Sequence, residues 1–236
     1  MPANSKIEWT QATWNPVTGC SKISSGCLNC YAERMARRLQ AMGSPRYKNG
    51  FQVALHEDVL DYPSKLRRPT MIFVNSMSDL FHEEVLYSFV CRVFDTMIRC
   101  PQHVFQLLTK RSSRLAEMAP DLPWPDNIWM GVTVEDAAAV ARIADLEKVE
   151  AAVCFLSCEP LIGPLGILPL EMIDWVIVGG ESGPGARPMQ AEWIEDILSQ
   201  CNFAEVPFFF KQWGGTRKKQ SGRELHGRIY DEMPLR

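Results

Sequence analysis

The sequence stretch that decides the fold is Trp175-Val-Ile-Val-Gly-Gly-Glu-Ser182, a short apolar run that ends abruptly in polar residues. Other stretches repeat this pattern, at residues 72–79, 104–111, 128–135, 153–159 and 206–213. Apolar runs of about four to eight residues, rich in Val, Ile and Phe, are typical of strands buried on both faces. Helix-like stretches alternate with these runs, at residues 31–39, 83–99, 136–148 and 191–201. The alternation predicts a parallel sheet with helical crossovers.

The spacing of these units predicts a partial barrel. Neighbouring strand ends, from Ser76 to Lys211, lie 23 to 33 residues apart, which suits one strand, one helix and two short loops. With a further strand before Cys20, the chain holds six or seven units and is slightly short for an eight-fold barrel. We therefore predict an α/β fold, a TIM-barrel-like partial (β/α) barrel of parallel strands over residues 1–213, followed by a basic extension over residues 214–236. An open doubly wound sheet is the alternative, and in either fold ligands bind at the carboxyl ends of the strands.

The composition is that of a globular protein with a real core. Of the 236 residues, 46% are hydrophobic and 22% are charged, which argues against a disordered or fibrous chain. The formal net charge of −3 gives no global positive field that would mark a nucleic-acid partner, although local basic patches remain compatible with one. Neither a signal-peptide-like run nor a membrane-length apolar stretch is present in the sequence, so we expect a cytoplasmic protein without membrane association.

The strongest chemical signal is a cluster of cysteines. Cys20, Cys27 and Cys30 crowd into eleven residues, whereas the other five of the eight cysteines are scattered among apolar neighbours. A two-residue gap lets two thiolates reach one metal centre, as in zinc and iron–sulfur sites. Three thiolates would leave one iron of a 4Fe–4S cluster open to another ligand. A zinc site completed by a remote residue, such as His56 or Cys158, and unliganded thiols are the alternatives.

The sequence resembles the radical S-adenosylmethionine superfamily, in its spore-photoproduct-lyase-like branch. More closely, it resembles a group of phage and bacterial proteins that carry a three-cysteine motif. The first gap between cysteines is usually three residues in the superfamily and is six here, and Asn29 stands where an aromatic residue usually precedes the third cysteine. The matching stretches span nearly the whole chain and are residues 14–20, 26–33, 75–79, 108–111, 156–161, 174–182 and 210–215.

The resemblance implies an enzyme with a redox cofactor. Cys20, Cys27 and Cys30 would hold a 4Fe–4S cluster, and the open iron would bind S-adenosylmethionine. An electron from a flavodoxin or ferredoxin would cleave S-adenosylmethionine to a 5′-deoxyadenosyl radical, which abstracts a hydrogen atom from the substrate. The cofactor would carry the chemistry, and the protein would position it and exclude water.

The resemblance and the strand ends together suggest roles for further residues. Asp79 could oppose the methionine ammonium, and Lys110 or Arg111 could meet its carboxylate or a substrate phosphate. The full set of expected cofactor-binding residues is Tyr31, Asn75, Ser76, Ser78, Asp79, Thr109, Lys110, Thr133, Ser157, Gly179 and Gly180. The candidate catalytic residues are Glu159, Glu181, Cys158 and Lys211. Glu159 and Glu181 could hold the ribose hydroxyls or act on the substrate. For Cys158, a core position is favoured over a hydrogen-atom donor.

The distribution of basic residues bears on the substrate class. Basic residues gather at residues 34–48, 65–68, 110–114 and 217–223, which favours a nucleic acid or nucleotide substrate that is modified or repaired. A non-catalytic nucleic-acid-binding protein stabilised by a metal or cluster is one alternative. A metal-free barrel enzyme is another, and a partner protein that completes the site stays open.

Overall fold

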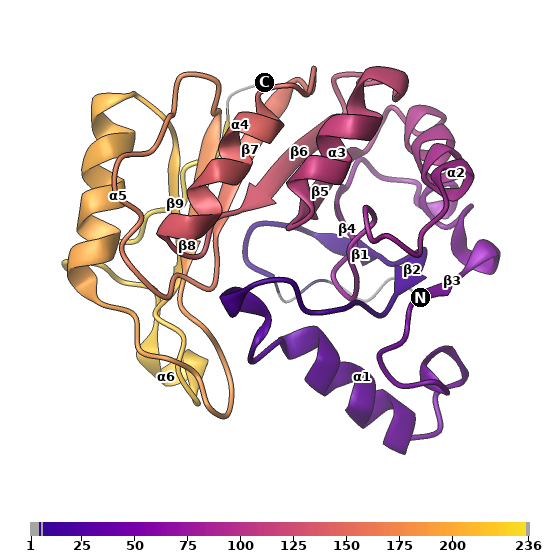
Figure 1. The fold of residues 1–236 in the computed structure, drawn as a ribbon, viewed down its shortest axis with the longest axis horizontal. Helices are drawn as coiled ribbons and strands as arrows, with labels where there is room; N and C mark the ends of the chain where they lie inside the picture. Colours follow the sequence, from indigo (N-terminus) through magenta and orange to yellow (C-terminus); the bar gives the residue numbers. More distant parts are fainter. Residues whose placement is uncertain (1–4, 6, 235–236) are drawn as a thin grey trace.

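The computed structural model describes Ser5 and residues 7–234, and its main feature is a curled sheet of seven strands (Figure 1). Every neighbouring pair in this sheet is parallel. In spatial order, which is also chain order, the strands are β1 (Ala12–Trp14), β4 (Met71–Val74), β5 (Val104–Thr109), β6 (Ile128–Thr133), β7 (Val153–Cys158), β8 (Trp175–Gly179) and β9 (Phe208–Gln212). A doubly wound sheet reverses its order at a switch point, and this one does not. The prediction of a partial barrel is therefore confirmed.

Helices cover the outer face of the sheet. In Figure 1, α2, α3, α4 and α5 lie along its outer arc, whereas α1 lies apart from them. The α-helices are α1 (Tyr31–Ala41), α2 (Tyr87–Ile98), α3 (Ser112–Met118), α4 (Arg142–Leu146), α5 (Ala191–Phe203) and α6 (Lys218–Ser221). Short 3-10 helices are η1 (Ser25–Cys27), η2 (Pro45–Tyr47), η3 (Glu57–Val59), η4 (Pro63–Lys65), η5 (Ala119–Asp121) and η6 (Ala137–Ala141). A two-stranded antiparallel sheet pairs β2 (Val17–Thr18) with β3 (Ala54–Leu55).

Two of the expected helices differ from their sequence patterns. The helix expected over residues 83–99 begins only at Tyr87, because Asp79 and His82 accept hydrogen bonds from the backbone N–H groups of Phe81 and Glu84 and hold the preceding chain in turns. The helix expected over residues 136–148 is divided into η6 and α4. Neither difference moves the strand ends.

The side-chain alternation of the strands separates two cores. Phe105 and Leu107 point into the larger core, which the helices cover. The opposite, concave face holds a second cluster rich in aromatic rings, formed by Trp9, Phe73, Trp129, Val153, Phe155, Trp175, Ile177 and Phe209. Trp175 lies at its centre, with ring centroids 6.2 Å from Trp9 and 5.9 Å from Phe209. This cluster fills the lower part of the curl, and the polar residues that follow the strands lie above it, at the carboxyl ends.

The chain after residue 213 packs along β9, an edge strand of the sheet. The backbone N–H of Phe210 donates to the carbonyl oxygen of Tyr230 at 2.9 Å, and Trp175 Nε1 donates to the carbonyl oxygen of Glu232 at 2.8 Å. The guanidinium of Arg223 lies 4.8 Å from the centre of the Phe209 ring. Covering an edge strand in this way removes a site of unwanted strand pairing. Among the described residues, no helix has the length and apolar character needed to cross a membrane.

Candidate functional site

The three clustered cysteines lie on a loop between β2 and α1. Cys20, Cys27 and Cys30 are all free thiols and all partly exposed. Cys27 ends η1, and Cys30 is the residue that precedes the first turn of α1. We call residues 19–30 the cysteine loop. Side chains that follow the ends of three strands hold this loop in place.

The first of these contacts is made by Arg111, which follows β5 and is almost completely buried. Its Nη1 donates to Cys20 Sγ at 3.4 Å and to Asp79 Oδ2 at 3.2 Å. Its Nη2 donates to Ser21 Oγ at 2.9 Å, and its Nε donates to Glu83 Oε2 at 2.9 Å. One guanidinium therefore ties the start of the cysteine loop to two carboxylates, using the fixed fork of donors that arginine offers.

The second contact lies after β6, where Glu135 and Asp136 accept hydrogen bonds from Ser24 and Ser25. The third lies after β8, where Glu181 Oε2 accepts a hydrogen bond from Asn29 Nδ2 at 2.9 Å. Each cysteine is thus held near a different strand end. Cys20 contacts a residue that follows β5, and residues just before Cys27 and Cys30 contact residues that follow β6 and β8. The loop is anchored across the mouth of the half-barrel rather than hanging free in solvent.

Glu181 was expected to hold ribose or to act on the substrate, and the structure gives it several partners within the protein. Besides Asn29, Arg187 donates to it from Nη2 at 2.6 Å, from Nε at 3.0 Å and from its backbone N–H at 2.9 Å. Burial would raise the pKa of Glu181, but the hydrogen bonds from Arg187 and Asn29 outweigh burial and lower the pKa to about 2. A carboxylate held in this way is suited to fixing the loop, not to proton transfer near neutral pH.

Glu159 and Lys211 meet at the mouth, as two of the residues expected to be catalytic. Lys211 Nζ lies 2.7 Å from both carboxylate oxygens of Glu159. A Cβ added at Gly179 would lie 3.3 Å from the Glu159 carboxyl carbon, so the missing side chain leaves room for this pair. The pair is mostly buried yet keeps some exposed surface, which makes it the best-placed charged group for contact with a ligand.

Asn75 is the most unusual polar residue of the site. It follows β4 directly and has only 3% of its surface exposed. Among the described residues, neither its Nδ2 nor its Oδ1 has a hydrogen-bond partner. Buried amides nearly always have partners, so this one is a candidate contact for a bound molecule. The Tyr31 hydroxyl donates to the carbonyl oxygen of the neighbouring Ser76, which ties α1 to the same strand end.

Asp79 and Thr109 were expected to bind cofactor, but their polar atoms are used inside the protein. Asp79 Oδ1 accepts from Thr109 Oγ1 at 2.7 Å and from the backbone N–H of Phe81 at 3.0 Å. Its Oδ2 accepts from the backbone N–H of Lys110 at 3.1 Å and from Arg111. Asp79 is therefore a link between two strand ends.

The serines and the other strand-end residues fall into two groups. Ser76 Oγ and Ser78 Oγ bond to Asn15 and to the carbonyl oxygen of Val17, so they fasten the segment after β1. Thr133 and Ser157 are register partners at the ends of β6 and β7, on the same face as the concave aromatic cluster. They continue that face toward the mouth.

Gly180 and Cys158 complete the set of expected site residues. A Cβ on Gly180 would collide with the backbone carbonyl of Trp213, so glycine is required for chain packing there. Cys158 belongs to the helix-covered core and has no exposed surface. The structure does not bring Cys158 to the mouth, since its side chain points to the opposite face from Ser157.

The thiols differ in how readily they lose a proton. Burial, followed by the nearby Asp79 carboxylate, raises the pKa of Cys20 to about 11 against the opposing charge of Arg111. The pKa of Cys27, by contrast, is lowered. Burial acts to raise it, but the backbone hydrogen bond at Ile23 and the charge of Lys110 outweigh burial. Lys110 was expected to face an anionic ligand group, and in the structure its positive charge stabilises the thiolate form of Cys27. Thiols must lose their protons to bind a metal.

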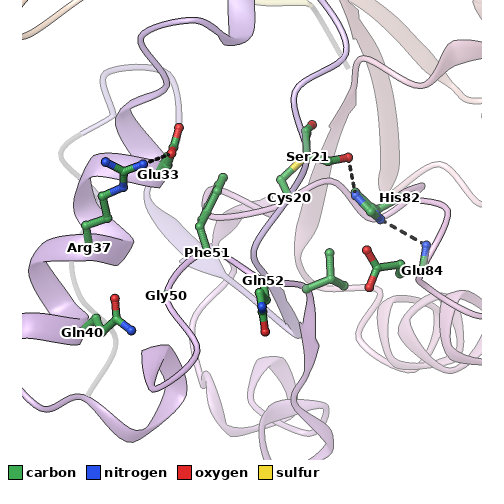
Figure 2. A pocket seen from close by; sticks show the side chains of 11 residues that line it. Cys20, Ser21, Glu33, Arg37, Gln40, Gly50, Phe51, Gln52, His82 and Glu84 are labelled. Atoms are coloured by element: carbon green, nitrogen blue, oxygen red, sulfur yellow. Dashed lines mark hydrogen bonds and ion pairs between the residues drawn. The ribbon is translucent and has the colours of Figure 1, made fainter.

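A cavity of about 690 Å³ opens beside Cys20, the only one of the three loop cysteines that lines it (Figure 2). Figure 2 shows the Glu33–Arg37 ion pair of α1 on one side and the Ser21–His82 hydrogen bond on the other. The cavity has the volume of a small-molecule site. Asn75, Glu159 and Lys211 do not line it, so the cavity is reached from the Cys20 side of the cysteine loop and not from the Glu159–Lys211 pair.

Sequence reasoning missed several residues that organise the site. Asn29, Glu135, Asp136, Arg142 and Arg187 were not among the expected site residues. A signal for Glu135 was present, because it follows a buried strand just as Glu159 and Glu181 do. No comparable signal marks Asn29, whose contact with Glu181 joins segments that are far apart in the chain, or Asp136, Arg142 and Arg187.

The structure is thus an α/β half-barrel of parallel strands with a cysteine loop at its mouth. The chain belongs to the family described as "Protein of unknown function (DUF5131)", whose profile matches residues 4–234. No curated protein matches the chain in sequence.

Solved structures of spore photoproduct lyase have a similar fold. A variant with dinucleoside spore photoproduct matches with a TM-score of 0.53 and 12% identity, over 85% of this chain and 63% of that one. Two other variants each match with a TM-score of 0.51. One has 13% identity over 76% of this chain and 58% of that one, and the other has 12% identity over 87% of this chain and 65% of that one. At such identities the likeness concerns the fold alone. This chain spans less than two thirds of the length of those lyase chains.

Proposed function

We propose that this protein is a radical S-adenosylmethionine enzyme that acts on a nucleic acid or nucleotide. Cys20, Cys27 and Cys30 would hold a 4Fe–4S cluster whose open iron binds S-adenosylmethionine. The observation that carries this proposal is the placement of three free, partly exposed thiols on one anchored loop at the mouth of a radical-SAM-like half-barrel. When bound, the cluster and S-adenosylmethionine would supply one-electron cleavage and a carbon-centred radical.

The donor set of the loop fits an iron–sulfur cluster. Three thiols are the ligands that such clusters take, and none of these thiols is engaged in a disulfide. Among the described residues, no group of three or more His, Cys, Asp or Glu side chains is already gathered around one metal position. Binding therefore requires the three thiols to turn toward a common centre, which their partial exposure allows.

The residues at the mouth can serve S-adenosylmethionine in distinct ways. The unpartnered amide of Asn75 can both donate to and accept from the amino-acid part of the ligand. Lys110 can oppose its carboxylate, and the carboxylate of Glu159, which is paired with Lys211, can accept from ribose hydroxyls or from substrate. Tyr31 lies between the cysteine loop and the strand end that carries Asn75. Catalysis by these residues consists of binding and orientation.

The concave aromatic cluster would protect a radical reaction. Trp129, Phe155, Trp175 and Phe209 occupy the floor of the curl and make it largely apolar. A dry floor prevents side reactions of a reactive species with water. The anchored cysteine loop would cover part of the opposite side.

A nucleic-acid or nucleotide substrate is supported by the fold and by basic residues near the mouth. Arg34, Arg37 and Arg38 lie on α1, directly after the cysteine loop. The solved spore photoproduct lyase structure with a TM-score of 0.53 holds a dinucleoside spore photoproduct. The reductant would be a flavodoxin or ferredoxin in the cytoplasm, and a partner protein that completes the substrate site is compatible with the shorter length of this chain.

The test is anaerobic turnover of S-adenosylmethionine. The protein is reconstituted with iron and sulfide, reduced with dithionite and assayed for 5′-deoxyadenosine, with the Cys27→Ala variant as control. We expect 5′-deoxyadenosine from the wild type and none from the variant. Formation at the same rate in both would refute the role of the loop. Metal binding without any S-adenosylmethionine cleavage would favour a non-catalytic, metal-stabilised nucleic-acid-binding protein.

A further inference from the structure

The long first gap of the cysteine loop rests on two acidic residues that follow β6. Ser24 Oγ donates to Glu135 Oε1, and Ser25 Oγ donates to Asp136 Oδ2 at 2.5 Å. These two serines lie in the six-residue gap between Cys20 and Cys27. Two consecutive residues of the gap are thus paired, in the same order, with two consecutive acidic residues.

Glu135 is held firmly enough to serve as a fixed support. Its side chain has no exposed surface, and Arg142 Nη1 donates to its Oε2 at 2.6 Å. The same Nη1 donates to the carbonyl oxygen of Thr133 at 2.6 Å, which ties the arginine to the end of β6. A buried carboxylate that is paired in this way has little freedom to move, because breaking the pair would leave a charge without compensation.

Gly26 is fitted against Glu135. A Cβ added at Gly26 would lie 2.9 Å from both Cγ and Oε1 of Glu135, closer than real Cβ atoms approach other atoms. Since Glu135 is fixed by Arg142, it cannot withdraw to make room. Glycine is therefore required directly before Cys27, and the loop backbone can approach the strand end closely.

Asp136 has a second task that fixes its own position. Its Oδ1 accepts a hydrogen bond from the backbone N–H of Ala139 at 3.2 Å, which caps the start of η6. Its Oδ2 remains for Ser25. The support under the cysteine loop is thus part of the helical connection that follows β6.

We propose that Glu135 and Asp136 are positioning residues for Cys27. By docking Ser24, Ser25 and Gly26, they allow the chain to span the long gap from Cys20 and still present Cys27 at the mouth. The consequence for cluster binding rests on the proposed function, whereas the positioning itself is a property of the ligand-free protein.

The direct readout is the rate at which Cys27 is alkylated by iodoacetamide in the reduced, metal-free protein, followed by mass spectrometry. We expect the single variant Gly26→Ala, which keeps the 3.7 Å contact between Ser24 Oγ and Cys27 Sγ, to react about tenfold faster at Cys27, since the loop is released from its support. The double variant Ser24→Ala, Ser25→Ala also loses that contact, which favours the Cys27 thiolate, and we expect it to react faster than the wild type by a smaller factor. Cys91, which is partly exposed on α2, is the internal control. Ser199→Ala, at an exposed position of α5, is the matched variant control.

Conservative rescue separates positioning from a general loss of structure. Ser24→Thr combined with Ser25→Thr keeps both hydroxyl donors and should return the Cys27 rate to within about twofold of the wild type. An unchanged Cys27 rate in both Ser24→Ala, Ser25→Ala and Gly26→Ala would overturn the proposal. Equal acceleration at Cys91 would also overturn it, because the effect would then be global.

Iron uptake distinguishes this proposal from the proposed function. We expect the Ser24→Ala, Ser25→Ala protein to retain less than half of the iron that the wild type takes up during anaerobic reconstitution. If the wild type takes up no iron while Cys27 alkylation responds as expected, the proposed function fails and the positioning stands. If the variant binds iron fully and its Cys27 rate is unchanged, the positioning fails and the proposed function stands.

Discussion

Replacing Asp79 by asparagine tests whether this residue is a link between strands or a ligand-binding group. Asp79 accepts four hydrogen bonds. Its Oδ1 accepts from Thr109 Oγ1 at 2.7 Å and from the backbone N–H of Phe81, and its Oδ2 accepts from the backbone N–H of Lys110 and from Arg111 Nη1 at 3.2 Å. Asparagine offers one carbonyl oxygen and one NH₂ group. If the oxygen keeps the contact with Thr109, the NH₂ group faces two donors that it cannot satisfy.

The size of the effect follows from these contacts. The variant loses a charge-assisted hydrogen bond, worth about 1.5–3 kcal/mol, and leaves a buried N–H group unsatisfied at a cost of about 1–3 kcal/mol. Arg111 keeps Glu83 as a partner, so the loss does not reach the sum of both upper limits. We expect the free energy of unfolding to fall by about 3–5 kcal/mol, and Tm to fall by about 10 °C for a chain of this size.

The assay is thermal unfolding of the metal-free protein under reducing conditions, followed by circular dichroism. Asp61→Asn is the matched control, because Asp61 is exposed and its ion pair with Arg99 has a distance of 3.5 Å. We expect the control to change Tm by less than about 2 °C. If Asp79→Asn changes Tm as little as the control does, the link does not exist. Asp79 would then return to its predicted role beside the methionine ammonium.

Three further perturbations examine the loop anchor, the floor and the charged pair. The pKa of Glu181 is lowered to about 2 from an ordinary 4.5, so its contribution is complete above pH 4.5 and is lost as the pH falls toward 2. Denaturant unfolding of Glu181→Gln should therefore show a loss of about 3 kcal/mol at pH 6 that vanishes near pH 2, and a pH-independent loss would contradict the anchor. Trp175→Ala should lower the free energy of unfolding by about 3–5 kcal/mol, and a loss under 1 kcal/mol would show that the concave cluster is not a packed floor. Glu159→Gln should slow 5′-deoxyadenosine formation by about tenfold to a hundredfold while Tm stays within a few degrees, and an unchanged rate would remove this pair from the site.

The barrel could be predicted from the sequence because its signal is local. Each buried strand is a continuous apolar run, and each run ends where the chain meets polar residues, as in Trp175 to Ser182. Parallel order and one-directional winding then bring the strand ends to one mouth. The helix starts were less predictable, since the start of α2 at Tyr87 depends on side-chain bonds from Asp79 and His82 to the backbone.

The roles of individual rim residues could not be predicted in the same way. Asp79 and Glu159 both follow strands and look equivalent in sequence, yet Asp79 is bonded to Thr109 and Arg111, whereas Glu159 pairs with Lys211 across the mouth. Such pairings join residues 30 to 52 positions apart, and no local pattern encodes them. The face of the sheet to which Cys158 belongs could not be predicted either. Strand alternation turns its side chain toward the helices, but which face each residue takes is fixed only once the strand register is known.

The metal content of the protein tests the central claim most directly. Iron, acid-labile sulfide and zinc are measured in one anaerobically purified sample, beside the triple variant Cys20→Ala, Cys27→Ala, Cys30→Ala. We predict about four iron and four sulfide per wild-type chain and neither in the variant. A colourless wild-type protein with one zinc per chain, or iron that persists without the three thiols, would contradict the account.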